Sequence, residues 1–478
     1  MQFDSLEYLI ALPLAVAVFY LIPHRGRWLW LLLVSYGFYA VWNPWCLTLI
    51  LGSTLVDFAV GIWLGKTERP LYRNLLLLLS LGTNLGLLFT FKYLSPAFHV
   101  GNGLFEALHL SYIPQIDTYL MPVGISFYTF QTLSYTIDVY RKRVEPTRHL
   151  GRFALFVSFF PQLVAGPIER YSHLYGQLER PVKFKDSNLV AGMQLMVWGL
   201  FKKIVISDRL AMVVDAVYAD PESYQGFGIW MGMLMFGFQV FCDFSAYTDM
   251  AIGSARMIGV ELSPNFENRI YFAPSKNRFW SGWHMTLIAW WRDYVFFPIA
   301  GRGKSRIRWY GGLFVIYLLT GIWHGAGWNF MIWGVANGIY VLIEYFIMRR
   351  MAPWRNQLEG KARMWFNVGG TAITMFISQF TGMAFRVPNL DTMWTMLDRM
   401  WMFAGSVPAW DDIGKHIALG GFLLLVMDQL HIRMKNRMFD QWLSTLKPWQ
   451  SWGLVTILIY VTLAMADQAE VPFQYFQF

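Results

Sequence analysis

The chain has 478 residues, of which 56% are hydrophobic and only 14% are charged. Soluble domains usually carry about 25% charged residues, so a soluble fold of this size could not bury so much apolar surface. The net charge of +9 comes from basic residues in short segments between apolar runs, which is typical of a membrane protein and not of a nucleic-acid-binding domain.

Long stretches without Asp, Glu, Lys or Arg recur along the chain and predict membrane-spanning helices, each of which needs about 20 mostly apolar residues. In chain order they are 8–24, 28–56, 74–91, 118–137, 223–242, 309–343, 364–385 and 448–466. Shorter apolar runs lie near 153–165, 187–218, 283–300 and 416–430. Charge interrupts or shortens the runs 153–165 and 283–300, so we expect them to be re-entrant or interfacial.

These patterns predict an all-α polytopic protein with about eleven or twelve spans, formed by residues 1–478 as a single integral membrane domain. Basic segments predicted to face the cytoplasm are His24–Arg27, Lys66–Arg73, Arg141–Arg152, Glu169–Lys185, Arg302–Arg308, Arg349–Arg363 and His431–Lys447. The segments 95–117, 219–225 and 387–412 and both termini are poor in basic residues, so we place them outside. Cys46 and Cys242 lie in apolar segments, which predicts reduced core residues and no cysteine metal site.

The stretch 309–343 contains no formal charge, and His324 lies near its middle. It is too long for one span, so we expect a helical hairpin in which Gly321, Gly325 and Gly327 mark a tight turn or close backbone approach. An ionisable residue at such a place is a functional-site hypothesis by default. Burial disfavours the imidazolium, so a neutral His324 would suit a general base. For the residue alone, a core histidine bonded to a backbone carbonyl is an equally good interpretation.

A second histidine, His284, lies in the segment 275–298, SKNRFWSGWHMTLIAWWRDYVFFP. The basic and aromatic residues around it are Lys276, Arg278, Trp280, Trp283, Trp290, Trp291 and Arg292. They indicate either a membrane interface, with Arg292 paired to Asp293, or a cytoplasmic site for a phosphorylated, adenine-bearing acyl donor. Two histidines without further ligands at suitable spacing predict no zinc or other metal site.

Two carboxylates, Asp243 and Asp249, lie in the otherwise apolar segment 238–259. Carboxylates at membrane depth need partners or a water-filled cavity. We expect them either to line a pore or to form structural ion pairs with Arg256 or Arg292.

The chain ends in VPFQYFQF, residues 471–478, whose one reactive hydroxyl belongs to Tyr475. Taken alone, this aromatic tail is typical of an anchor in the outer membrane interface.

Several segments together resemble the membrane-bound O-acyltransferase family, and most closely its bacterial branch for alginate- or cellulose-type O-acetylation. They are PVGISFYTFQTLSYTIDVYR (122–141), LVAGPIER (163–170), CDFSAYTDMAIG (242–253), FWSGWHMTLIAWWRDY (279–294), GIWHGAGWNFMIWG (321–334) and the aromatic tail. The segments occur in family order over most of the chain. Ser281 and Gly282 lie where alginate-type relatives tend to have arginines, so the polymer stays open between alginate, cellulose and another exopolysaccharide.

The resemblance implies helices around a central tunnel, with His324 as the catalytic histidine and His284 as the second characteristic one. It also implies acetyl-CoA as an acyl donor reached from the cytoplasm, with no bound cofactor. Related systems hand the acyl group to a periplasmic acyltransferase of the SGNH type. In the D-alanylation system an aromatic C-terminal motif is thought to carry the acyl group on its tyrosine, so Tyr475 becomes a candidate acyl relay.

We therefore expect an O-acyltransferase of the bacterial inner membrane that moves acetyl groups across the membrane for exopolysaccharide O-acetylation. Its expected partners are the SGNH-type protein, a polysaccharide synthesis complex and membrane lipids, but no nucleic acid. The residues expected to bind substrate are Trp323, Asn329, Trp283, Arg278, Trp291, Arg292, Asp243, Tyr247 and Asp249. Two alternatives remain: a transporter or export channel with Asp243, Asp249 and His324 as a proton path, and a direct acyltransferase for lipid or peptidoglycan.

Overall fold

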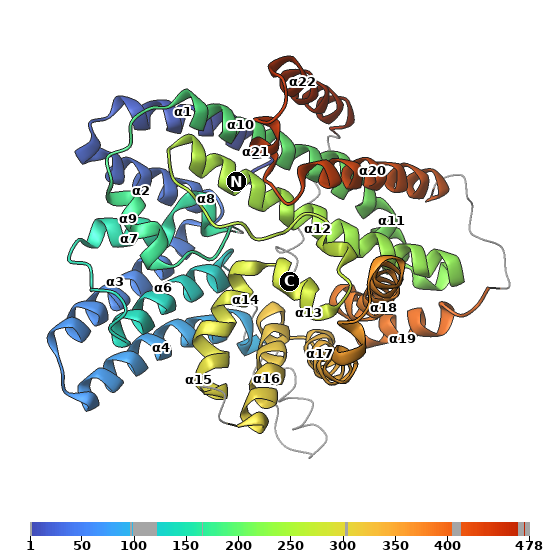
Figure 1. Ribbon diagram of the computed structural model, residues 1–478. Helices are drawn as coiled ribbons and strands as arrows, with labels where there is room; N and C mark the ends of the chain where they lie inside the picture. The colour runs from blue at the N-terminus through green and yellow to red at the C-terminus, as the bar shows by residue number, and fades with distance from the viewer. Residues whose placement is uncertain are drawn as a thin grey trace. The chain divides into compact units, whose positions relative to one another are not determined.

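The computed structural model describes residues 2–95, 98, 122–164, 166–301, 305–403, 413–466 and 473. Every regular element in these ranges is a helix (Figure 1), which confirms the predicted all-α fold class. The chain divides into two compact units, one of residues 1–193 and 250–263 and the other of residues 194–249 and 264–478. It passes between the units within α10 (Asp186–Leu200) and α12 (Gly226–Met257). The expected single membrane domain stays a prediction.

The first unit is built from short and long helices that follow one another closely in the sequence. Its helices are α1 (Leu6–Leu21), α2 (His24–Ala40), α3 (Pro44–Lys66), α4 (Pro70–Lys92), α6 (Ile125–Tyr140), α7 (Leu150–Ser158), α8 (Phe160–Leu163) and α9 (Tyr171–Glu179). The run 153–165 holds the end of α7 and all of α8, with Phe159 between them, and its expected re-entrant or interfacial position stays a prediction.

A buried carboxylate holds α3, α4 and α6 together in the first unit. Asp57 on α3 accepts hydrogen bonds from the Ser80 hydroxyl at 2.5 Å and the Asn84 amide at 2.8 Å, both on α4. The Thr136 hydroxyl of α6 donates to the same carboxylate at 3.2 Å. Polar residues at membrane depth need such partners, so Asp57 specifies how these three helices pack.

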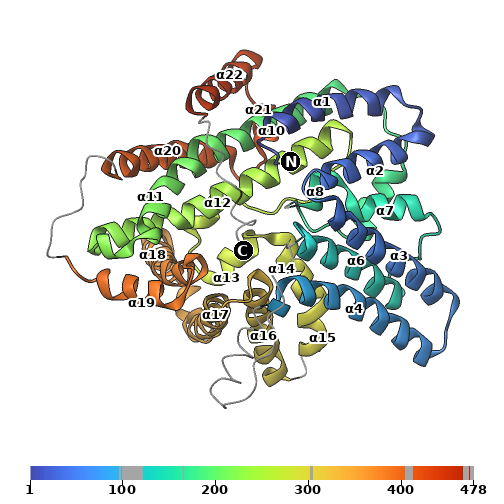
Figure 2. The ribbon, with the colours of Figure 1, turned by 180° about the vertical axis from the view of Figure 1, so that it is seen from behind.

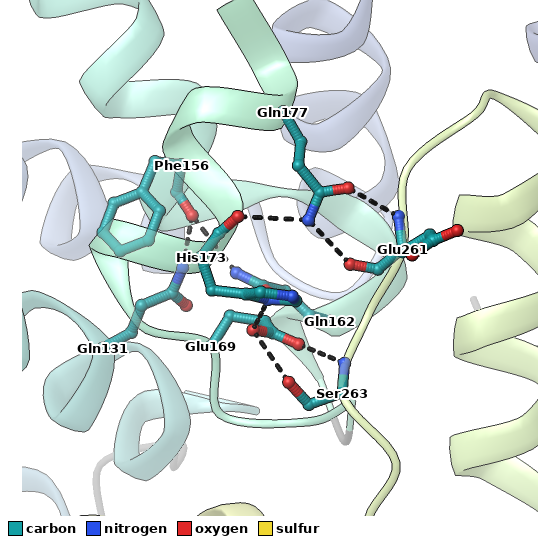
Figure 3. Close-up of polar contacts among 8 residues, drawn as sticks. All are labelled: Gln131, Phe156, Gln162, Glu169, His173, Gln177, Glu261 and Ser263. Carbon is teal, nitrogen blue, oxygen red and sulfur yellow. Dashed lines mark hydrogen bonds and ion pairs between the residues drawn. The ribbon is translucent and has the colours of Figure 1, made fainter.

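The segment after α12 is tied to the start of α9 by polar contacts (Figure 3). The Glu169 carboxylate accepts hydrogen bonds from the His173 ring at 2.7 Å and from the Ser263 backbone N–H at 2.5 Å. The Gln177 side chain pairs with both backbone groups of Glu261, each at 2.9 Å. The LVAGPIER segment therefore has a structural role here, because its glutamate clamps residues 261–263.

The carbonyl of Phe156 near the end of α7 is satisfied by two side-chain amides (Figure 3). Gln162 donates to it at 3.2 Å, and Gln131 of α6 donates to the same oxygen. Carbonyls in the last turn of a helix lack intrahelical partners, so the two glutamines complete this helix end.

The second unit contains the remaining helices, whose bounds are as follows. They are η1 (Phe201–Ser207), α11 (Asp208–Ala219), η2 (Pro221–Ser223), η3 (Ile270–Phe272), α13 (Lys276–Gly282), α14 (Met285–Trp291), η4 (Arg292–Phe296), α15 (Phe297–Ala300), α16 (Arg306–His324), α17 (Trp328–Arg355), α18 (Gly360–Arg386), α19 (Leu390–Arg399), α20 (Ile413–Met434), α21 (Phe439–Leu443) and α22 (Pro448–Met465). Residues 285–300 form a continuous helix made of α14, η4 and α15, and the expected re-entrant or interfacial position of the run 283–300 stays a prediction. Helices α11 and α20 pack side by side (Figure 2).

Seven helices of the described ranges are long and apolar enough to cross a membrane. They are α3, α4, α12, α17, α20, α22 and the continuous helix Asp186–Ala219 formed by α10, η1 and α11. Other apolar helices, such as α1 and α16, are shorter or less apolar. The chain is therefore a multi-pass membrane protein, and the larger count of eleven or twelve spans stays a prediction.

Two buried ion pairs hold η1 against α12. The Lys202 amine lies 2.8 Å from the Asp249 carboxylate and 2.7 Å from the Ser245 hydroxyl. The Lys203 amine lies 3.2 Å from Asp243. Of the two alternatives for these aspartates, the structure supports ion pairing, but their partners are lysines of η1 and not the expected Arg256 or Arg292. A pattern within 238–259 could not reveal partners about 40 residues earlier in the chain.

Lys203 also bonds Asp208 at 2.8 Å, so replacing it with methionine leaves two carboxylates without their buried cation. We expect Lys203→Met to lower the free energy of unfolding by about 3–5 kcal/mol, because removing one partner strands a buried charge. Thermal unfolding in detergent measures this loss. The matched control is Lys142→Met, which removes the solvent-exposed pair with Glu68 and should leave the melting temperature unchanged. Equal effects of the two variants would contradict a buried stabilising network.

Candidate active site

His324 is the last residue of α16, and three residues separate it from α17 (Figure 1). The uncharged stretch 309–343 thus forms the predicted helical hairpin, with the histidine at its turn. The imidazole is buried, at 6% exposure, among aromatic rings. The ring centroids of Trp333 and Phe385 lie 5.3 and 4.9 Å from it. The site is therefore well shielded from bulk solvent.

Glycines bring the two arms of this hairpin into backbone contact. A Cβ atom on Gly321 would lie 2.4 Å from the Phe330 carbonyl oxygen, and one on Gly334 would lie 2.7 Å from the Tyr317 carbonyl oxygen. A Cβ atom on Gly325 would lie 2.2 Å from the ring of Phe330. Small residues allow such close helix packing in membranes, so both predicted roles, turn and close approach, are confirmed.

His324 lies in the wall of a cavity of ≈ 130 Å³, which we call the His324 cavity. Its aromatic lining residues are Phe236, Phe238, Tyr271, Phe279, Trp280, Trp283, Trp333 and Phe385. Lys276 and Ser378 supply polar groups to the same wall. An engineered cavity of about 150 Å³ can hold benzene, so the space suits a small acyl group. Trp283 thus lines the same cavity as His324, and its role in substrate binding stays a prediction.

His284 is fully buried at the start of α14, in a left-handed backbone conformation with φ 45°. Its Nδ1 lies 3.4 Å from the side-chain oxygen of Asn265, which also accepts from the Thr286 backbone N–H at 3.3 Å. Because that oxygen only accepts, Nδ1 carries the proton and Nε2 carries a lone pair. Burial lowers the pKa of His284 to about 3, so the ring is neutral. A non-glycine residue held at positive φ is a strained position of the kind found at functional sites.

Trp323 links the two histidines. Its ring centroid lies 6.3 Å from the ring of His284 and 4.8 Å from that of the neighbouring His324. Asn329 lies just beyond the turn, where its amide donates to the Val387 carbonyl at 3.0 Å. The structure therefore brings together His324, Trp323 and His284, and it gives Asn329 a role in fixing the hairpin.

The C-terminal tail reaches the same region through Phe473. This residue is fully buried, and its ring stacks on that of Tyr247 at 3.9 Å. It also lies 6.0 Å from Phe244, whose ring meets His284 edge-on at 4.7 Å. At Phe473 the tail is thus a core element and not an interfacial anchor. Tyr475 lies outside the described residues.

The two arginines expected to bind the donor are engaged elsewhere. Arg278 bonds Glu267 and the Ser281 hydroxyl, and Arg292 forms an ion pair with the adjacent Asp293 at 2.9 Å. The second pair is the one that the interface interpretation predicted. The nearby Trp291 is buried in the protein core.

A second cavity, of ≈ 590 Å³, lies beside the start of α13, and we call it the arginine pocket. Its basic lining residues are Arg349 and Arg355 of α17 and Arg363 of α18. The Nε of Arg355 is buried and has no hydrogen-bond partner among the described residues. The sequence predicted only a cytoplasmic segment for these arginines. Their side chains converge through the turn between two helices, and the sequence pattern does not show that convergence.

The two cavities share the first turn of α13. Ser275 and Asn277 line the arginine pocket, whereas Lys276 lines the His324 cavity. The Glu344 carboxylate, also in the arginine pocket, accepts the backbone N–H groups of Lys276 at 2.7 Å and Asn277 at 2.9 Å. Neighbouring residues at the start of α13 therefore line both the arginine pocket and the His324 cavity.

Comparison with known proteins identifies a family and relatives of this chain. The membrane-bound O-acyltransferase family matches residues 147–385, which include both histidines. The chain is 36% identical to the probable alginate O-acetylase AlgI of Pseudomonas putida over 84% of this chain and 81% of that protein. It is 34% identical to a peptidoglycan O-acetyltransferase of Helicobacter pylori over 68% of each chain. It is 26% identical to a teichoic acid D-alanyltransferase of Streptococcus thermophilus over 48% of this chain and 58% of that protein.

Proposed function

The chain belongs to the membrane-bound O-acyltransferase family, and on that premise we propose that it transfers acetyl groups from acetyl-CoA for O-acetylation of an exopolysaccharide. The observation that carries this proposal is His324 in the wall of a small aromatic cavity within the matched region. The relatives compared above include a probable alginate O-acetylase and a peptidoglycan O-acetyltransferase. We assign this chain to an alginate- or cellulose-type polymer and to the bacterial inner membrane.

His324 acts in this proposal as the general base. It takes the proton of the acceptor hydroxyl while that oxygen attacks the carbonyl carbon of the thioester. The aromatic walls of the His324 cavity exclude bulk water, which would otherwise hydrolyse the thioester. Neutral His284, next to Trp323, helps to position the reacting groups from the far side of that indole.

The arginine pocket is the proposed docking site for the phosphates of acetyl-CoA. Guanidinium groups bind phosphate in a bidentate manner, and three of them line this pocket. The basic segment 349–363 faces the cytoplasm by its charge, where acyl-CoA is found. The donor's thioester would then reach the His324 cavity past the start of α13.

The proposed acceptor side is the C-terminal tail. Phe473 lies two residues before Tyr475 in the chain, and its ring stacks on that of Tyr247 in the core of the second unit. We propose Tyr475 as an acyl relay that passes the acetyl group to a periplasmic partner of the SGNH type, next to a polysaccharide synthesis complex.

The export-channel alternative has weaker support. Asp243 and Asp249 would have to exchange protons, yet both are held by buried lysine amines at 3.2 and 2.8 Å. A direct acyltransferase for lipid or peptidoglycan would share the chemistry of His324 and differ in its acceptor. Measuring acetyl transfer to purified polymer and to lipid extracts, side by side, distinguishes polymer acetylation from direct acylation of lipid.

Replacing the base tests the core of the proposal. We expect His324→Gln to lower acetyl transfer from radiolabelled acetyl-CoA by about 10²–10⁴-fold, the usual contribution of a general base. The protein should remain in the membrane fraction at wild-type abundance. His416→Gln, on α20 away from the cavity, is the matched control and should retain full activity. A fully active His324→Gln enzyme would remove this residue from the chemistry.

The relay has its own test. After incubation with isotope-labelled acetyl-CoA, mass spectrometry of the C-terminal peptide should detect the label on Tyr475, and Tyr475→Phe should abolish both that label and polymer acetylation. Tyr460→Phe, at an exposed position of α22, is the control. If Tyr475→Phe acetylates polymer at the wild-type rate, the tail serves only as a structural element.

A further inference from the structure

Lys276 places a buried amine in the wall of the His324 cavity. The residue is 3% exposed, although lysine is rarely buried so fully. Its amine donates to the Ser378 hydroxyl at 2.9 Å. The same amine lies 4.7 Å from the ring centroid of Phe279 and 5.6 Å from that of Trp280. One hydroxyl and two aromatic faces are thus its immediate surroundings.

No carboxylate of the described residues forms an ion pair with Lys276. The closest acidic group in the hydrogen-bond network is Glu344, whose oxygens already accept two backbone N–H groups. Tyr271 of η3 and His324 of α16 line the same cavity as Lys276, and Tyr317 of α16 packs on the ring of Trp280 at 5.6 Å. On α17, Tyr340 lies within the electrostatic reach of Glu344. Burial lowers the pKa of Lys276 to about 7, and the charge of Glu344 opposes this effect.

An ammonium group buried without a counter-ion is costly, and a methionine of similar shape would fill the same space without that cost. The cavity therefore has a positive group whose favourable partner is not supplied by the described protein. A developing negative charge in the cavity would be such a partner. In a shielded site of low dielectric constant, a preorganised cation stabilises such a charge strongly.

We propose that the Lys276 ammonium stabilises the oxyanion that forms on the thioester carbonyl during acyl transfer. This inference rests on the proposed function of His324. The acceptor oxygen bonds to the carbonyl carbon, its proton passes to His324, and the carbonyl electron pair moves onto the oxygen beside Lys276. When the carbonyl re-forms, the C–S bond breaks, and the leaving thiolate takes the proton from the His324 imidazolium. The products are an ester and a free thiol.

Two other roles for Lys276 predict different kinetics. A purely structural cation, held by Ser378 and the aromatic rings, would affect stability and not the rate of transfer. An anchor for an acyl chain that ends in a carboxylate would affect KM and leave kcat unchanged. The oxyanion role predicts a loss of kcat at nearly constant KM, because the charge it meets exists only in the transition state.

The test uses the full-length protein in membranes that retain its partner proteins, with acetyl-CoA as donor and a short polysaccharide acceptor. We expect Lys276→Met to lower kcat by about 10²–10³-fold, with KM for acetyl-CoA within about threefold of wild type and a melting temperature at least as high as that of the wild type. Lys361→Met, at an exposed position of α18, is the matched control. If Lys276→Met does not fold, Ser378→Ala provides a second measurement: the cation stays, and the loss in kcat should be small.

The pH profile supplies a readout that a structural role would not move. In the wild type, kcat/KM should fall as pH rises above about 7, where Lys276 loses its proton. Lys276→Arg keeps its charge at all these pH values, so its profile should lack this fall. Lys276→Met with wild-type kcat, or with a change in KM alone, would overturn the proposal. A wild-type protein without any acyl transfer would instead overturn the proposed function.

Discussion

The backbone contact between α16 and α17 is the constraint on which the rest of the site depends. Gly321 and Gly334 face one another without side chains, so the two helices approach more closely than any larger residue would allow. This approach fixes the turn that follows His324 and holds the imidazole against Trp333 and Phe385. A small cavity lined by His324 lies at this turn.

The buried lysines of the second unit differ in their surroundings, and we infer that they differ in function. Lys202 and Lys203 are neutralised by aspartates of α12, and we interpret them as part of the scaffold. Among the described residues, the amine of Lys276 contacts the Ser378 hydroxyl and two aromatic rings, and we assign it to the reaction. A cation of the scaffold is stabilised by a permanent counter-ion. A cation that stabilises a transition state must instead be able to interact with the charge that forms during the reaction.

The hairpin was predictable because its signal is local: an uncharged stretch that is too long for one span, with glycines beside its histidine. The all-helical class followed from the recurrence of apolar runs in the same way. Long-range pairing was not predictable, since nothing in the sequence near Asp243 points to Lys203. The sequence pattern placed Lys276 and Arg278 in the same interfacial cluster. In the structure, the direction of its side chain distinguishes Lys276 from Arg278, two residues later. Burial of Phe473 was likewise hidden, because aromatic tails in membrane interfaces and in cores have the same composition.

The central claim is that acyl transfer takes place in the His324 cavity, with the donor's phosphates in the arginine pocket. The most direct measurement is a cryo-EM structure of the protein bound to a thioether analogue of acetyl-CoA, which cannot transfer its acyl group. The account predicts density for the phosphates among Arg349, Arg355 and Arg363, and density for the acyl end between His324 and Lys276. An analogue bound with its acyl end outside the His324 cavity would contradict it.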